Sequence, residues 1–331
     1  MVLEFAGAGA QALAWLHSVG GSSRTILEAT DRYAAASVIE AIGFEPDHFT
    51  APGVAQALAA AAFSRAQSLA AGETVVGLGC TATIATDRTK RGDHRCCLAL
   101  YDGHNLTTAT LTLQKGRRSR LEEEQLVSLL IINAIAEGCG LPPAAPPPLL
   151  PDEQLIRRSL LSAPIEQLQA GQTAWLSIAP DDSLKSGLVW PGLAILSGSF
   201  NPVHQGHLQM AEVVARLLGR QVYFELPLLN ADKGIVPPAE ALRRRAQFTD
   251  TASLLMTTAP LFSQKAQIFP DSVFIVGVDT ATRLLQLRFY NDDPAQMRAS
   301  LDQVRQHGGR FLVAGRLDAD TGQFLTMADV A

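Results

Sequence analysis

Apolar and polar positions alternate along the chain in two blocks, which a proline-rich stretch separates. In the first block, short apolar runs typical of strands give way to segments with apolar residues at helical spacing. The pattern predicts strands at 2–6, 74–78, 95–101 and 107–113, and helices at 10–16, 34–42, 54–69 and 121–137. Strands and helices that alternate in this way indicate a layered α/β domain.

The proline-rich stretch, residues 141–151, holds six prolines in eleven residues. Proline sets φ and lacks the backbone N–H, so this stretch predicts a stiff extended spacer. A helix is expected next at 153–168, and a short strand at 173–179. We therefore predict an N-terminal domain at 1–140, a linker and bridging segment at 141–190, and a C-terminal domain at 191–331.

The second block opens with an apolar strand at 193–196, a turn with glycines, and a helix that begins near His207 and ends at Gly219. Further strands are expected at 222–226, 273–276 and 311–314. This alternation predicts a second α/β domain.

The turn of the second block reads Ser197-Gly-Ser-Phe-Asn-Pro-Val-His-Gln-Gly-His-Leu208. A helix N-terminus offers unsatisfied amide donors and a partial positive charge, which suit anionic oxygens. Gly206 has no side chain to keep a phosphate away from the backbone, and His204 and His207 can both donate hydrogen bonds to phosphoryl oxygens. Two surface histidines at a helix cap are the alternative. The order of strand, glycines, proline and histidines indicates a nucleotide-phosphate site.

The same residues resemble the nucleotidylyltransferase superfamily, whose shared motif is His-x-Gly-His. The wider pattern Gly-x-Phe-x-Pro-x-His-x-Gly-His is most similar to the nicotinamide or nicotinate mononucleotide adenylyltransferases. The resemblance implies a Rossmann-like (HUP-type) parallel sheet, ATP as a substrate, Mg²⁺ on the triphosphate, and transfer of AMP to a pyridine mononucleotide. Around His204 and His207 it implies nucleotide contacts from Gly198, Ser199, Phe200 and Gly206.

Basic residues further along fit the same family. Lys233, which follows the second strand of this block, matches the family's basic residue there and is implied to assist catalysis. The run Arg243-Arg-Arg245 is expected to open the next helix, and Arg244 is our candidate for the family's downstream arginine. A solvated helix face is the alternative for three consecutive arginines.

The strand expected at 273–276 runs into Gly277-Val-Asp279, which matches the family's Gly-x-Asp. The resemblance implies that Asp279 contacts the ribose of a bound nucleotide, and a helix N-cap is the alternative for this aspartate. Phe289 and Tyr290 fall near the place where bacterial relatives stack an aromatic ring on the pyridine. Core packing is the alternative for either ring.

One motif of the family is missing. The family carries Ile-Ser-Ser-Thr-x-x-Arg near its C-terminus, where hydroxyls and a guanidinium hold the triphosphate, and this sequence ends at Ala331 without it. We expect that the sequence stops short of the motif. The alternative is an incomplete phosphate grip. For the function as a whole, the alternatives are a nucleotidyltransferase with another phosphorylated acceptor, or a non-catalytic nucleotide sensor.

The N-terminal domain resembles the CinA-type nicotinamide-nucleotide amidases, a family with a three-layer α/β/α fold. The similarity rests on Gly21-Ser-Ser23, Gly77-Leu-Gly-Cys-Thr81 and Gly116-Arg-Arg118. Active members use a serine nucleophile and a lysine, and counting along the chain puts these positions at Ala6 and near Val38. Neither side chain can attack an amide or accept a proton, so we predict that the amidase activity is absent.

Nucleotide binding by the N-terminal domain stays open at this point. Gly7 and Gly9 leave room for a phosphate between strand and helix, and Arg118 keeps the family's arginine. A mere tight turn is the alternative for the two glycines. The charged segment 87–95 is either a basic lid or a solvated surface loop.

Composition narrows the setting. At 331 residues, of which 47% are hydrophobic and 18% charged, the chain can bury two cores. Its net charge of −5 argues against nucleic-acid binding and leaves small-molecule nucleotides as partners. Four cysteines without a Cys-x-x-Cys pair, and no signal peptide or apolar span, predict a soluble cytoplasmic protein that does not bind membranes. A homo-oligomer is left open.

Overall fold

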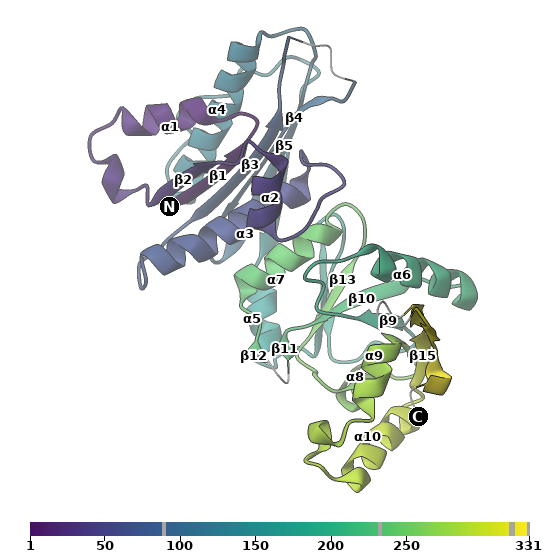
Figure 1. The fold of residues 1–331 in the computed structure, drawn as a ribbon. Helices are drawn as coiled ribbons and strands as arrows, with labels where there is room; N and C mark the ends of the chain where they lie inside the picture. Colours follow the sequence, from purple (N-terminus) through teal and green to yellow (C-terminus); the bar gives the residue numbers. More distant parts are fainter. Residues whose placement is uncertain (88–90, 231–233, 318–321, 330–331) are drawn as a thin grey trace. The chain divides into compact units, whose positions relative to one another are not determined.

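The computed structural model describes residues 1–87, 91–230, 234–317 and 322–329, and the chain forms two compact units (Figure 1). The first unit contains Met1–Ala163, Pro180–Ser183 and Pro237–Thr251, and the second contains Pro164–Ala179, Leu184–Val236 and Ala252–Ala331. The domain boundaries at 140 and 190 stay a prediction. The two compact units divide the chain differently from the predicted domains. The proline-rich stretch lies inside the first unit, and so does the segment 237–251 from the middle of the second block.

A six-stranded mixed sheet forms the centre of the first unit. Its strands are β1 (Val2–Ala6), β2 (Glu28–Asp31), β3 (Gly77–Thr83), β4 (His94–Tyr101), β5 (Asn105–Leu113) and β6 (Leu155–Leu161). They follow the order β2-β1-β3-β4-β5-β6. β1 is parallel to β2 and β3, and the neighbours from β3 to β6 are antiparallel.

Helices cover both faces of this sheet (Figure 1). They are α1 (Ala10–His17), α2 (Ala35–Ile42), α3 (Pro52–Leu69) and α4 (Arg120–Gly138). The helix α7 (Pro238–Arg245) packs on α3, and the unit also has the short 3-10 turns η1 (Ser22–Arg24) and η2 (Ala246–Phe248). One buried cluster joins Phe5 of β1 to Ile131 of α4, and another joins Ala6 to Val38 of α2 and Leu58 of α3. Because neighbouring side chains of a strand point to opposite faces, the two clusters lie on opposite sides of β1 and the unit has three layers.

Glycines let α3 pack closely on β3. A Cβ on Gly79 would lie 2.3 Å from the carbonyl oxygen of Ala55, and one on Gly77 would lie 2.1 Å from the backbone nitrogen of Phe63. The facing residues Ala55 and Ala59 of α3 are fully buried. The Gly-x-Gly pattern of the strand and the alanine-rich helix are therefore the two sides of one contact.

The proline-rich stretch lies against α4. The Asn133 side chain donates from Nδ2 to the carbonyl of Ala145 at 2.8 Å and accepts from the Ala144 N–H at 2.9 Å. The stretch leads into β6, which pairs with β5 at the edge of the sheet. The helix expected at 153–168 is therefore wrong for residues 155–161, because hydrogen bonds to β5 use their backbone groups, and α5 (Ala163–Gln169) begins after them.

A buried ion pair joins the chain segments of the first unit. Arg245, at the end of α7, is fully buried, and its Nη1 lies 2.5 Å from Oδ1 of Asp182. The same nitrogen donates to Gln56 Oε1 at 3.0 Å and to Thr249 Oγ1 at 2.8 Å. Burial raises the pKa of Asp182 and lowers the pKa of Arg245, and each partner opposes that effect on the other. The pair ties α7 and residues 180–183 to α3.

A seven-stranded sheet forms the second unit. Its strands are β7 (Trp175–Ile178), β8 (Leu184–Gly187), β9 (Ala194–Ser197), β10 (Val222–Pro227), β13 (Leu254–Thr257), β14 (Val273–Gly277) and β15 (Arg310–Ala314). They follow the order β15-β14-β9-β10-β13-β7-β8. The five strands from β15 to β13 are parallel, and β7 and β8 add an antiparallel hairpin beside β13.

The direction of winding reverses between β9 and β14. From β9 the chain steps to β10 and β13, then returns to β14 on the other side of β9 and continues to β15. The chain therefore leaves β9 and β14 toward opposite sides of the sheet. In open parallel sheets, ligands bind at such a reversal point, beyond the carboxyl ends of the strands. The expected α/β class is confirmed, and this sheet fits a Rossmann-like fold.

Helices and short ladders complete the second unit. Besides α5, they are α6 (Gln205–Leu218), α8 (Phe262–Ile268), α9 (Val278–Leu284), α10 (Pro294–Gln306), η3 (Leu287–Tyr290), η4 (Met327–Asp329), and the strand pairs β11 (Leu229–Asn230) with β12 (Gly234–Ile235) and β16 (Arg316–Leu317) with β17 (Phe324–Leu325). Ile195 of β9, Ala266 of α8 and Val304 of α10 share one buried cluster. Within the described ranges, none of the helices has both the length and the apolar character of a membrane span.

The buried pair of the first unit can be tested by removing one charge. Asp182 has a φ of 69°, which asparagine tolerates, so Asp182→Asn removes the charge without new backbone strain. It should lower the free energy of unfolding of the first unit by about 3–5 kcal/mol, because Arg245 becomes a buried, unpaired charge. Hydrogen exchange of the β3 and β4 amides measures this loss.

The control is an exposed ion pair of the same unit. Arg157 and Glu137 lie 2.5 Å apart, with side chains 45% and 52% exposed. Glu137→Gln should change the same free energy by less than about 1 kcal/mol. Equal losses for the two variants would contradict a structural role for the buried pair.

Candidate functional site

The turn between β9 and α6 lies at the reversal point of the second sheet. Phe200 occupies its centre with a φ of 44° and a side chain that is 1% exposed. A Cβ on Gly198 would lie 2.7 Å from this ring, and the ring itself packs edge-on against His207 and Phe224. Phe200 thus supports the turn from below, and its ring does not face solvent.

His204 and His207 stack on each other at the start of α6. Their ring centroids are 3.6 Å apart and their planes differ by 23°. The backbone N–H of His204, the N-cap residue, donates to Nδ1 of His207 at 3.3 Å. Because Nδ1 accepts this hydrogen bond, a neutral His207 carries its proton on Nε2, where it can be donated to a ligand oxygen.

The electrostatics favour the neutral form of this second ring. Burial, and then the like charge of His204, lower the pKa of His207 from 6.5 to about 4. At neutral pH His207 is therefore an uncharged donor. Two donors at a helix N-terminus, one of them exposed in His204, form an arrangement suited to phosphate oxygens.

Gly206 makes room for this stack. A Cβ at Gly206 would lie 3.1 Å from Nδ1 and 3.2 Å from Cε1 of the His204 ring. Any larger residue would press on the ring and separate the two imidazoles. The spacing His-x-Gly-His is thus explained by packing as well as by access to the backbone.

Asp279 projects from the neighbouring strand end. It lies in the first turn of α9, directly after β14, and is exposed. Its Oδ2 lies 3.2 Å from Nη1 of Arg316, which is also exposed. A Cβ at Gly277 would meet no atom within 4 Å, so the approach to the strand end is open. Since β14 pairs in parallel with β9, Asp279 and the histidine turn follow neighbouring strands at the same edge of the sheet.

The other basic candidates are placed differently. Lys233 lies outside the described residues. Arg244 lies on α7, in the first unit, where its Nε is 2.7 Å from Oε1 of Glu240. The three arginines close α7 instead of opening it, and Arg243 and Arg245 also have partners in the first unit, the carbonyl of Ile42 and Asp182. The nucleotide contact assigned to Arg244 stays a prediction.

The two aromatic candidates differ in burial. Tyr290 is buried, and its hydroxyl donates to the carbonyl of Leu284 at 3.0 Å. Phe289 is half-buried between the guanidinium groups of Arg283 and Arg288, which lie 5.3 and 4.6 Å from its ring centroid. Tyr290 therefore packs in the core, and Phe289 is the ring that a ligand can reach.

One cluster beneath the turn was not foreseen from the sequence. Glu225 of β10 and Lys265 of α8 form an ion pair at 2.5 Å, and both side chains are almost completely buried. Ser197, the last residue of β9, donates from Oγ to Glu225 at 2.6 Å. The available signal was the glutamate inside the apolar run Val222-Tyr-Phe-Glu-Leu-Pro227, because a buried carboxylate requires partners.

In the first unit, the positions that the resemblance assigns to an amidase lie together. Ala6 and Val38 belong to one buried apolar cluster with Ile42 and Phe44. The strand partner of Ala6 is Thr81, whose hydroxyl donates to the carbonyl of Phe49 at 2.8 Å. This part of the structure is core.

The glycine turn after β1 is already bound to a carboxylate. Glu124 of α4 accepts hydrogen bonds from the N–H of Gly9 at 3.0 Å and from the N–H of Gln11 at 3.2 Å. These are the amides at the N-terminus of α1 that a phosphate would use. The carboxylate takes the place of the anion.

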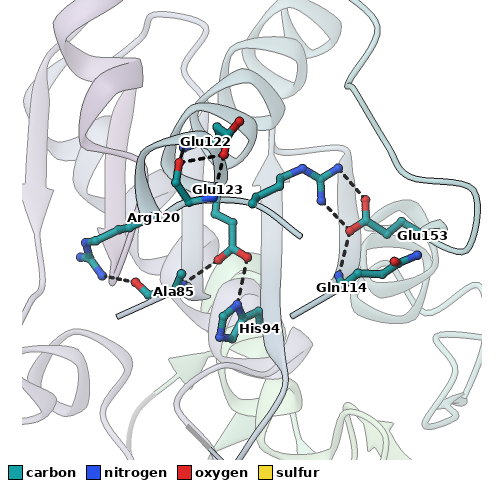
Figure 2. A network of polar contacts seen from close by, with 9 residues as sticks. Ala85, His94, Gln114, Arg120, Glu122, Glu123 and Glu153 are labelled. Atoms are coloured by element: carbon teal, nitrogen blue, oxygen red, sulfur yellow. Dashed lines mark hydrogen bonds and ion pairs between the residues drawn. The ribbon is translucent and has the colours of Figure 1, made fainter. Parts of the chain in front are cut away.

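Figure 2 shows the carboxylate of Glu153 in several hydrogen bonds, and its ion-pair partner is the arginine retained in the first unit. Arg118 and Glu153 share two hydrogen bonds of 2.6 and 2.8 Å. Burial alone would raise the pKa of Glu153, but the hydrogen bonds from Arg118 and from the N–H groups of Leu150 and Gln114 lower it to about 2. Arg118 is thus occupied by an ionised carboxylate.

Figure 2 also shows that the carboxylate of Glu123 contacts both His94 and Ala85. Nδ1 of His94 lies 2.9 Å from Oε1 of Glu123, and the Ala85 N–H donates to the other carboxylate oxygen at 2.6 Å. Arg120 donates to the carbonyl of Ala85 at 2.8 Å. These contacts anchor the strand end that precedes the charged segment.

The family match falls in the C-terminal part of the chain. Residues 195–288 match the cytidylyltransferase-like family. A putative nicotinamide mononucleotide adenylyltransferase of Schizosaccharomyces pombe is 29% identical over 116 residues, which cover 31% of this chain and 45% of the relative. A probable nicotinate-nucleotide adenylyltransferase of Desulfotalea psychrophila is 30% identical over 125 residues, which cover 30% of this chain and 57% of the relative.

The chain therefore spans about half the length of the curated relatives it matches. The C-terminal part carries a cytidylyltransferase-like domain, and the similarities support the nucleotidylyltransferase superfamily for that part. The resemblance of the first unit to the CinA-type amidases stays a prediction.

The pKa of His207 gives a direct test of this site. Its imidazole should titrate with a pKa of about 4, because burial and His204 disfavour the charged form. Between this value and the ordinary 6.5 the folded state binds fewer protons than the unfolded state, so the second unit should lose stability as the pH falls through that window. NMR titration of the imidazole signals measures the pKa. His204→Ala should raise it, and titration of the wild-type ring near 6.5 would contradict the structure.

Proposed function

We propose that the protein transfers AMP from ATP to a pyridine mononucleotide and releases pyrophosphate, a reaction of NAD biosynthesis or salvage. The observation that carries the proposal is the stacked pair His204 and His207 at the N-terminus of α6, at the reversal point of a parallel sheet. The cytidylyltransferase-like match and the two adenylyltransferase relatives support it.

In the proposed reaction, a 5′-phosphate oxygen of the mononucleotide attacks the α-phosphorus of ATP in line. A new P–O bond forms as the bond to the β-phosphate oxygen breaks, and pyrophosphate leaves with the bonding electrons. The His207 Nε2–H and the His204 ring hold the phosphates and stabilise the charge that develops on their oxygens. No covalent enzyme intermediate is needed.

The remaining candidates complete this assignment. Asp279 orients a ribose from the end of β14, and Lys233 and Arg244 contribute positive charge. Mg²⁺ enters with ATP, bound by phosphate oxygens and water, which suits an ion that keeps several waters. The described residues offer no group of three or more His, Cys, Asp or Glu side chains for a metal of the protein's own. Small nucleotides are the partners, and the cytoplasm is the expected location.

The first unit has a different part in this proposal. With Ala6 and Val38 in its core, it lacks amidase activity, and Glu124 and Glu153 occupy the groups that would hold a phosphate. The alternative acceptor is another phosphorylated molecule. The contrasting class is a non-catalytic nucleotide sensor.

The assay combines purified protein, ATP, Mg²⁺ and either nicotinamide or nicotinate mononucleotide. The expected result is a dinucleotide and an equal amount of pyrophosphate with at least one acceptor. His207→Asn should lower kcat by about 10²–10³-fold, because it removes a donor to the transition state. ATP binding without dinucleotide, for both acceptors, would favour the sensor.

The matched control is His307→Asn. His307 is exposed and lies at the C-terminal end of α10. This change should leave kcat within about twofold, as expected for a surface site away from the chemistry. A comparable loss in both variants would show that the assay reports on general damage.

A further inference from the structure

The cluster beneath the phosphate-binding turn joins the carboxyl ends of three parallel strands. Ser197 ends β9, Glu225 lies near the end of β10, and Thr257 ends β13. Ser197 and Thr257 each donate a hydroxyl hydrogen bond of 2.6 Å to Glu225, one to each carboxylate oxygen. The strand ends are thus linked through one side chain.

Lys265 closes the cluster from α8. Its Nζ lies 2.5 Å from Glu225 Oε2 and 3.2 Å from Ser197 Oγ, so the lysine, the serine and the glutamate contact one another in a ring. The ammonium group also lies 5.3 Å from the centroid of the Phe262 ring. In this way every acceptor of the cluster receives a donor.

The pair is fully removed from water. The Lys265 and Glu225 side chains are 3% and 0% exposed. A buried ion pair is weak evidence for stability, since well-packed apolar residues of the same volume often serve as well or better. Its directional hydrogen bonds, by contrast, hold their partners in one geometry, and they are strong in a dry interior.

That geometry is transmitted to the histidine turn. Ser197 is the residue immediately before the turn, and the next N–H, of Gly198, donates to the backbone carbonyl of Glu225 at 3.0 Å. Both the side chain and the main chain of Glu225 therefore hold the point at which the chain leaves β9. Two residues later Phe200 supports the ring of His207.

We infer that Glu225 and Lys265 are positioning residues for the phosphate-binding turn, and that they set where the His204 and His207 donors stand. The inference rests on the proposed adenylyl transfer. Neither residue touches a reacting atom, so loss of the pair should lower kcat more than it raises the KM for ATP, because donors aimed at the transition state lose their alignment.

The test separates position from stability. Lys265→Met alone leaves a buried carboxylate unpaired and should lower the melting temperature and kcat together. The double variant Lys265→Met with Glu225→Leu removes both charges, so the melting temperature should return most of the way to that of the wild type. The kcat should stay about 10–100-fold low, since misplacement by about 1 Å can have that effect. A double variant with wild-type kcat would overturn the inference.

Ser197→Ala is the second variant, in case the double variant does not fold. It removes only the hydroxyl that links the turn to the pair, and should lower kcat by about tenfold while the fold is kept. The exposed pair Arg216 and Glu212 on α6, 3.8 Å apart, supplies the control Arg216→Met, which should leave kcat unchanged. Wild-type kcat in Ser197→Ala would overturn the inference as well.

NMR signals of the His204 and His207 rings keep the inference distinct from the proposed function. If the wild-type protein transfers no AMP, the proposed reaction is refuted, but the ring signals still report on the turn. They should shift in Ser197→Ala and remain in place in Arg216→Met. Unchanged signals in Ser197→Ala would overturn the positioning role whatever the activity.

Discussion

A charge that leaves water must find a partner inside the protein, and each unit contains a buried arginine or lysine paired with a carboxylate. Arg245 and Asp182 meet in the first unit, and Lys265 and Glu225 meet in the second. Desolvation of each ion opposes folding by several kcal/mol, so the pairs add little net stability. Their main effect is to fix which side chains face each other. The first pair joins separate chain segments of the first unit, and the second contacts Ser197, the residue from which the histidine turn leaves β9.

The two glycine turns show how similar local structures acquire different roles. In the first unit the amides at the start of α1 are bound by Glu124, which lies on another helix of the same unit. In the second unit the start of α6 carries His204 and His207 instead. Two charged rings 3.6 Å apart would repel each other, and the lowered pKa of His207 avoids this. The pair offers hydrogen-bond donors without placing a second positive charge beside the first.

Local patterns in the sequence were sufficient for much of this structure. The apolar run at 2–6 gave a strand with the expected bounds, and the helix after the histidine turn begins two residues before the expected position and ends at the expected glycine. These elements are predictable because the spacing of apolar residues and the residues at helix ends can be read from a short stretch of sequence. The strand β6 is not, because its residues Ile156, Arg157 and Ser159 are solvent-exposed at a sheet edge. Only the presence of β5 decides between strand and helix there.

The remaining features depend on residues far apart in the chain. Glu225, Ser197, Thr257 and Lys265 come from four elements, and nothing near any one of them identifies the others. Arg244 illustrates the opposite case: its neighbours predicted a helix correctly, but the unit in which that helix packs is set by Arg245 and a partner 63 residues earlier in the chain, Asp182.

The membership of α7 connects the two blocks of the sequence physically. In the order of the chain, this helix lies between β10 and β13, two adjacent parallel strands of the second unit, and yet it packs on α3 of the first. Without α7, the first unit would expose the apolar residues around Ala246, and Gln56 would lose the guanidinium of Arg245. The first unit therefore depends on a helix encoded within the proposed transferase. This dependence gives a structural reason why the two blocks of the sequence occur in one chain.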